Sequence, residues 1–143
     1  MKFELPKLIL ASGSPRRSEI MNAVGWDFTK IVPDIDESEF ESENPADYVR
    51  RLAQTKAEAI AANHPGSMVL GADTTVVIDN QIIGKPIDLA DARRMLRLLS
   101  GRTHEVLTGV AVVKNGETRV GLQTTKVKFA ELDDKQIEFL VEF

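Results

Sequence analysis

The chain contains no cysteine among its 143 residues. Disulfide bridges and thiolate metal sites are therefore excluded, and the composition fits a reducing compartment. No apolar run approaches the roughly 18–20 residues that a membrane-spanning helix needs. Residues 1–7 also lack the long apolar region of a signal peptide. We therefore expect a cytoplasmic protein with no membrane partner.

An excess of basic residues is also missing. There are 18 lysines and arginines against 22 aspartates and glutamates, which gives a net charge of -4 and a pI near 5.2. Binding to nucleic acid usually requires a basic face, so nucleic acid is not an expected partner. Hydrophobic residues make up 43% of the chain, which is enough for one domain with a core. We find no repeats, low-complexity segments or linkers.

Apolar runs and helix signals alternate along the first part of the chain. Strands are expected over residues 5–10, 28–32, 68–73 with an extended continuation to 78, 81–84, 106–114 and 118–129. Helices are expected over residues 15–24, from 45 to the helix breakers at 63–66, from a cap at Asp88 to Ser100-Gly101, and after a cap at Asp133. Asn115-Gly116 is a strong hairpin signal between the last two strands. This order predicts an α/β fold, a mixed, twisted sheet with helices on its faces.

The segment from Ala11 to Arg17 (ASGSPRR) joins an apolar strand to a helix. Ser14 is placed to cap that helix, and Pro15 occupies its first position, where a missing N–H costs nothing. Free N–H groups at the helix start and the guanidinium groups of Arg16 and Arg17 favour an anion such as phosphate. The alternative is two solvated arginines, although cations at this end oppose the helix dipole.

Three further charged residues are candidates for chemistry. Asp73 follows a buried strand, where open α/β sheets bind ligands, although it could simply cap the next turn. Lys56 lies on an otherwise apolar helix face with Val49 and Leu52, and such a lysine more often extends into solvent. Lys85 follows a strand in Gly84-Lys85-Pro86, and by position alone it is more often a surface lysine.

An acidic stretch covers residues 34–43 and has no apolar helical face, so it is expected to be a loop. Glu37 and its neighbours could bind a cation, although most acidic loops are simply solvated. An EF-hand is excluded, because the loop lacks the required glycine and ligand spacing.

Taken together, these segments resemble the signature of the Maf (septum-formation) nucleotide pyrophosphatases. The matching segments are residues 8–17 (LILASGSPRR), 34–37 (DIDE), 52–57 (LAQTKA), 71–74 (GADT), 84–86 (GKP) and 99–104 (LSGRTH). They occur in the order seen in the family and extend over essentially the whole chain. No single segment would be specific, but the combination is.

The resemblance implies a Maf/ITPase-like fold and a metal-dependent hydrolase. Such an enzyme cleaves nucleoside triphosphates between the α and β phosphates to give the monophosphate and pyrophosphate, with Mg²⁺ or Mn²⁺. It is cytoplasmic and often a homodimer. The implied catalytic residues are Asp73 as proton acceptor, Arg17, Lys56 and Lys85. The positions that match Ser12 and Glu37 also line the site in the family. Our own hypothesis adds Ser12, Ser14, Arg16 and Thr74 as substrate-binding residues, and Glu37 and Asp73 as metal ligands.

Arg16 and Thr74 indicate the subgroup that acts on dTTP and UTP, since the 7-methyl-GTP subgroup differs at both positions. Family members continue beyond position 143 with a Gly-Ala-Tyr-Gly-Ile-Gln-Gly-like segment. We therefore expect residues 1–143 to form a single Maf-like domain that lacks the C-terminal segment of the family. The alternative function is a nucleotide-binding or self-associating module with little catalysis.

Overall fold

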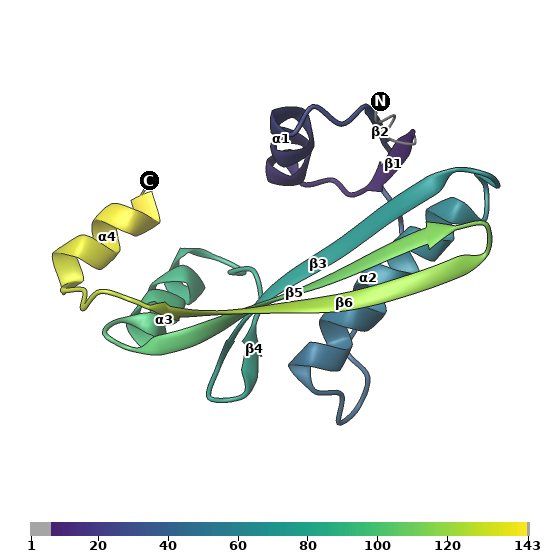
Figure 1. The fold of residues 1–143 in the computed structure, drawn as a ribbon. Helices are drawn as coiled ribbons and strands as arrows, with labels where there is room; N and C mark the ends of the chain where they lie inside the picture. The colour runs from purple at the N-terminus through teal and green to yellow at the C-terminus, as the bar shows by residue number, and fades with distance from the viewer. Residues whose placement is uncertain (1–6, 143) are drawn as a thin grey trace. The chain divides into compact units, whose positions relative to one another are not determined.

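The computed structural model describes residues 7–142, and these form two compact units. The first unit contains the residues up to Asp73 together with Thr108–Gln123, and the second contains Thr74–Leu107 and the residues from Thr124 onwards. Three long strands belong to both units (Figure 1). They are β3 (Met68–Ile78), β5 (Thr103–Lys114) and β6 (Glu117–Lys128).

The strands form one mixed sheet, as the sequence predicts. Four further elements of the first unit are β1 (Leu8–Ala11), α1 (Pro15–Ala23), β2 (Phe28–Lys30) and α2 (Pro45–Ala61). The second unit adds β4 (Gln81–Ile83), α3 (Leu89–Leu99) and α4 (Asp134–Glu142). The strand order is β2-β1-β3-β5-β6, with β4 paired to β3. β1 runs parallel to β2 and β3, whereas β3 and β4 are antiparallel.

Strand β1 is buried along its whole length, because helices of the first unit cover both of its faces. Ile9 packs in one cluster with Ala53 and Ala57 of α2. Leu8 and Leu10, which point to the opposite face, pack in a second cluster with Met21 of α1. Burial on both faces explains why the sequence of β1 is continuously apolar instead of alternating.

The sequence pattern places Ile20, Met21 and Val24 on one apolar face of α1, and this expectation is only partly correct. Met21 is buried, but Ile20 is 61% exposed and Val24 is 64% exposed. Ile20 is turned away because successive helical residues are about 100° apart. Val24 is the C-cap, outside the regular helix. Strands β1 and β2 also differ slightly from expectation, since β2 ends at Lys30 and the start expected for β1 at residue 5 lies outside the described residues.

Helix α2 lies very close to the sheet, because two neighbouring strands carry a glycine beneath it. A Cβ atom on Gly71 of β3 would lie 2.5 Å from the Ala53 carbonyl oxygen and 2.9 Å from the Ala57 nitrogen. A Cβ atom on Gly109 of β5 would similarly overlap the backbone of Val49. The close approach sets the height of α2 above the sheet, and therefore the reach of its side chains.

Local signals define two helix caps and the hairpin turn as predicted, whereas β5 starts at Thr103, three residues before the expected start. Asp88 caps α3 by accepting a hydrogen bond from the Asp91 nitrogen at 2.8 Å. Asp133 and Gln136 cap α4 reciprocally, at 2.8 and 2.9 Å. Asn115 and Gly116 both have positive φ, 52° and 75°, as a tight hairpin turn of the predicted kind requires.

The sequence pattern predicts an apolar face of α3 formed by Ala92, Met95, Leu96 and Leu99, and these residues are half-buried. In the second unit Arg93 of α3 pairs with Glu138 of α4 through nitrogen–oxygen distances of 2.6 and 3.2 Å. Within residues 7–142, no helix combines the length and the apolar character that crossing a membrane demands.

Candidate active site

The turn that follows β1 is organised around a buried hydroxyl group. Ser12 is 4% exposed, and its Oγ accepts hydrogen bonds from the Ser14 nitrogen and from Nη1 of Arg17, both at 3.1 Å. The Ser14 hydroxyl in turn caps α1 by accepting from the Arg17 nitrogen at 3.5 Å. The Arg17 guanidinium is thereby held at the carboxyl end of β1, next to the start of α1, whereas Arg16 is exposed.

Asp73 lies at the same edge of the parallel strands. Ala11 of β1 is in register with Gly71 of β3, so Ser12 and Asp73 both follow the last paired residues of neighbouring parallel strands. The strand itself continues past Asp73 to Ile78, and the pairing with β4 begins at Val76. Asp73 therefore lies between the part of β3 that pairs with β1 and the part that pairs with β4.

The Lys56 ammonium connects two carboxylates. Its Nζ lies 2.9 Å from Oδ1 of Asp73 and 3.0 Å from Oε1 of Glu37. The side chains of Lys56 and Asp73 are only 14% and 13% exposed, whereas that of Glu37 is 58% exposed. Lys56 therefore does not extend into solvent. Since an unpaired buried charge is costly, the three groups stabilise one another.

The first unit thus contains two small groups of the predicted residues. One is formed by Ser12, Ser14 and Arg17, and the other, which we call the carboxylate–lysine cluster, by Glu37, Lys56 and Asp73. Thr74 and Lys85 belong to the second unit, and both are exposed.

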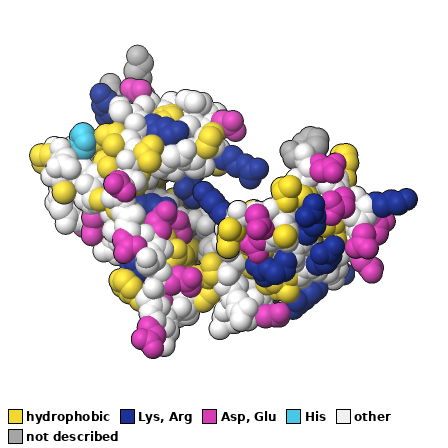
Figure 2. Space-filling model, turned by 180° about the vertical axis from the view of Figure 1, so that it is seen from behind, with side chains coloured by type: hydrophobic (Ala, Val, Ile, Leu, Met, Phe, Trp, Pro, Cys, Tyr) yellow, Lys and Arg dark blue, Asp and Glu magenta, His cyan; other side chains and the backbone are white. Residues whose placement is uncertain are grey.

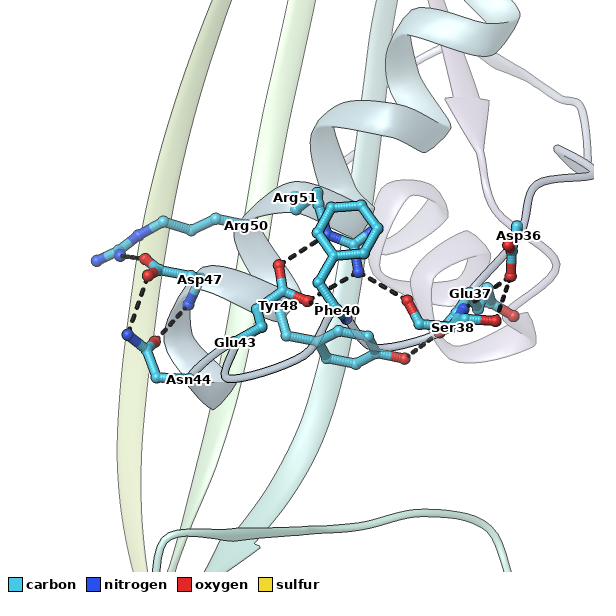
Figure 3. A network of polar contacts seen from close by, with 10 residues as sticks. All are labelled: Asp36, Glu37, Ser38, Phe40, Glu43, Asn44, Asp47, Tyr48, Arg50 and Arg51. Atoms are coloured by element: carbon cyan, nitrogen blue, oxygen red, sulfur yellow. Dashed lines mark hydrogen bonds and ion pairs between the residues drawn. The ribbon is translucent and has the colours of Figure 1, made fainter.

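The contacts that hold Glu37 in place could not be predicted from the sequence. The Tyr48 hydroxyl donates a 2.6 Å hydrogen bond to the Glu37 carbonyl oxygen, and Arg51 binds other residues of the same acidic loop, residues 34–43 (Figure 3). Tyr48 and Arg51 are three positions apart on α2 and therefore share one side of the helix. This spacing in the sequence indicates that the two side chains share one side of α2. It does not indicate which residues they bind, because that depends on how the loop folds.

Two carboxylates beside each other form a donor set that suits Mg²⁺ or Mn²⁺. Both ions prefer oxygen ligands, and Mg²⁺ commonly takes one or two carboxylates and completes its shell with water and substrate phosphates. Glu37 and Asp73 already share one cationic group, the Lys56 ammonium. Among the residues described, no set of three or more His, Asp or Glu side chains forms a complete metal site. The two carboxylates therefore fit such an ion as part of its ligand set.

Tyr48 is the only tyrosine in the chain and reports on this cluster. Burial raises the pKa of its phenol above the ordinary value of 10.0, and the charges of Asp73 and Glu37 raise it further. Because the folded pKa exceeds the unfolded one, this group stabilises the fold fully below pH 10 and loses that contribution as the pH rises through the folded pKa. A tyrosinate absorbance titration should therefore have a higher midpoint in the folded chain than in denaturant.

The Asp73→Asn variant should lower that midpoint, since it removes one of the charges that raise the pKa. Asp27→Asn, at an exposed position of the same unit, is the matched control and should leave it unchanged. Equal midpoints for folded and denatured chain would contradict the described surroundings of Tyr48.

Comparison with known proteins identifies one family and relatives that share a name. The family described as Maf-like protein matches residues 7–142. The chain is 49% identical over 138 residues to the dTTP/UTP pyrophosphatase of Symbiobacterium thermophilum, covering 96% of this chain and 71% of that protein. It is 47% identical over 135 residues to the dTTP/UTP pyrophosphatase of Vibrio cholerae, covering 94% and 72%.

Among solved structures, a HAM1 protein from Coxiella burnetii matches with a TM-score of 0.62 at 18% identity, over 87% of this chain and 73% of that one. The Staphylococcus aureus Ham1 protein matches with a TM-score of 0.58 at 18% identity, over 87% and 72%. At such identity the likeness shows a shared fold and nothing more.

Proposed function

The chain belongs to the Maf family, and from this premise we propose that it is a nucleoside triphosphate pyrophosphatase acting on dTTP and UTP. The relatives at 45–49% identity are named for this activity. The enzymatic function is therefore favoured over a module that only binds nucleotides or self-associates. The single structural observation that supports it most is the carboxylate–lysine cluster at the edge of β1 and β3.

The reaction consumes one water molecule and breaks one phosphoanhydride bond. Water adds to phosphorus, the P–O bond between the α and β phosphates breaks, and the products are the nucleoside monophosphate and pyrophosphate. In our proposal Asp73 accepts the proton that the water loses, because its carboxylate is held in place by Lys56 and is largely shielded from solvent. The Lys56 ammonium offsets the negative charge that grows on the phosphate oxygens.

The turn after β1 is the proposed binding site for the phosphates. Hydroxyl groups of Ser12 and Ser14, the N–H groups at the start of α1 and the Arg17 guanidinium are all donors suited to phosphate oxygens. We propose Lys85 as a further phosphate contact, and Arg16 and Thr74 as residues that select the base.

We propose that Mg²⁺ or Mn²⁺ is required and that Glu37 and Asp73 hold it. When bound, the cation neutralises phosphate charge and orients the triphosphate. Both carboxylates then have two roles, since they also fix the Lys56 ammonium.

The substrate is expected to be a free nucleotide rather than nucleic acid. The chain is acidic overall, and on the face shown in Figure 2 acidic and basic side chains are interspersed. From the family resemblance we further propose that the protein works as a homodimer in the cytoplasm and that residues 1–143 act as one Maf-like domain.

Product analysis tests the proposed function. With Mg²⁺, dTTP and UTP should each yield one pyrophosphate and one monophosphate, faster than ATP, GTP or CTP. Anion-exchange chromatography with separate assays for pyrophosphate and orthophosphate makes the distinction. Release of orthophosphate and a nucleoside diphosphate would mean that a different bond is cleaved, and a flat profile across nucleotides would contradict the substrate assignment.

A further inference from the structure

Arg51 is the centre of the contacts between α2 and the acidic loop. Its Nε and Nη2 bind the two carboxylate oxygens of Glu43 at 2.7 and 2.8 Å, and Nη2 also donates to the Ser38 carbonyl oxygen at 2.8 Å (Figure 3). The guanidinium carbon lies 3.7 Å from the centre of the Phe40 ring. One side chain therefore contacts the loop at three positions, and only arginine combines a planar fork with a stacking face.

These contacts differ from an ordinary surface ion pair. The Glu43 side chain is 9% exposed and that of Arg51 is 23% exposed. Glu43 also accepts a hydrogen bond from the Phe40 nitrogen at 3.2 Å, which closes the loop on itself. The hydrogen bonds from Arg51 lower the pKa of the Glu43 carboxyl, so this pair stays charged at neutral pH.

One of the loop residues that Arg51 contacts, Ser38, directly follows Glu37 in the chain. The carbonyl groups of Glu37 and Ser38 are held by Tyr48 and Arg51 respectively, both from α2. The Asp36 carboxylate accepts from the Ser38 nitrogen at 2.9 Å and so fixes the turn from the other side. The backbone of the loop is thus tied to α2 at two successive carbonyl groups, those of Glu37 and Ser38. Arg51 lies five positions before Lys56 on the same helix.

Without such ties the loop would not be expected to stay near the carboxylate–lysine cluster. The acidic loop contains six carboxylates, those of Asp34, Asp36, Glu37, Glu39, Glu41 and Glu43. Their mutual repulsion, and the repulsion of Asp73, favour an extended loop that leaves α2. Two positive charges of α2 oppose this repulsion. Arg51 pairs with Glu43 of the loop, and Lys56 pairs with Glu37 and Asp73 in the carboxylate–lysine cluster.

We propose that Arg51 is a positioning residue that holds the acidic loop against α2 and so keeps the Glu37 carboxylate at Lys56. Arg51 itself does not touch the substrate. The inference rests on the proposed function in one respect, that Glu37 takes part in the reaction, whereas the holding of the loop stands on geometry alone.

Three variants at two neighbouring positions test it. Arg51→Gln removes the charge and the fork, and Arg51→Lys keeps the charge but removes the fork. Arg50→Gln is the matched control, because Arg50 is the neighbouring residue of α2 and its side chain makes, among the described residues, only an exposed ion pair with Asp47. Each variant is compared with the wild-type chain for kcat and KM on dTTP, and for amide hydrogen exchange of peptides that cover residues 36–43.

Both Arg51 variants should exchange faster within residues 36–43 and not in the core of α2, and kcat should fall about tenfold to a hundredfold with a smaller change in KM. Arg50→Gln should match the wild type in both respects. A role that is only structural would instead accelerate exchange throughout the first unit. Wild-type kcat in Arg51→Gln, unchanged exchange in the loop, or full rescue by Arg51→Lys would overturn the inference.

A failure of the proposed function can be distinguished from a failure of this inference. The proposed function is wrong if the wild-type chain releases no pyrophosphate from dTTP or UTP. Hydrogen exchange does not depend on turnover. Unchanged exchange in Arg51→Gln therefore overturns the holding of the loop whether or not the chain is active.

Discussion

Asp73→Asn should lower kcat for dTTP and UTP by about a thousandfold, because an amide cannot accept the proton of the attacking water and general acid–base groups typically contribute 10²–10⁴. The substitution keeps the shape of the side chain. Lys56 retains its ion pair with Glu37 at 3.0 Å, so the loss of stability should remain below the about 3–5 kcal/mol seen when a buried ion pair loses its only partner. Steady-state kinetics beside thermal unfolding measure the two effects independently.

Asp27→Asn removes the same charge from an exposed position of the first unit and should keep wild-type kcat. If Asp73→Asn is folded and turns over at the wild-type rate, Asp73 is not the proton acceptor. If Asp73→Asn fails to fold, Glu37→Gln tests whether the carboxylate–lysine cluster takes part in the reaction. This substitution changes the same cluster at a side chain that is 58% exposed.

Gly71→Ala should be among the most destabilising single substitutions in the first unit. The added methyl group would lie 2.5 Å from the Ala53 carbonyl oxygen and 2.9 Å from the Ala57 nitrogen, and neither backbone atom can rotate away. Overpacking of this kind costs about 3 kcal/mol, which for a chain of this size lowers Tm by roughly 10 °C. Because α2 must move outward, Lys56 should also lose contact with Asp73, and kcat should fall with stability.

Gly121→Ala is the matched control for that substitution. Gly121 lies on β6, and its backbone is not in the left-handed region. Apart from its neighbours in the chain, no described residue has a heavy atom within 4 Å of an added Cβ. Its stability should change by no more than about 0.5 kcal/mol. An unchanged Tm for Gly71→Ala in thermal unfolding would show that α2 does not depend on this glycine for its position.

Local chemistry explains which parts of the fold could be predicted from the sequence. The caps at Asp88 and Asp133 and the Asn115-Gly116 turn depend on residues within three positions of one another, so a single sequence contains the whole signal. The apolar stripe of α2 was equally clear, because seventeen helical residues give a repeated period. Helix α1 has nine residues and packs mainly through Met21, which is too little periodicity to define a face.

The candidate site was predictable in part for the same reason. Ser12, Ser14 and Arg17 contact each other within six residues of sequence, so their grouping follows from the strand-to-helix turn. Lys56 and Asp73 are separated by seventeen positions and meet only because α2 packs closely on β3. The contacts of Arg51 could not be predicted, since they require the acidic loop to fold back on α2, and loop residues carry no periodic signal.

The proposed site is tested most directly by a crystal structure of the chain with Mg²⁺ and α,β-imido-UTP, which cannot be cleaved between the α and β phosphates. We expect phosphate oxygens at Ser12 and Arg17, and the α phosphate next to Lys56 and Asp73. A triphosphate bound elsewhere, for example in the cavity of the first unit lined by Glu58, His64 and Val113, with no contact to Lys56 or Asp73, would contradict this expectation.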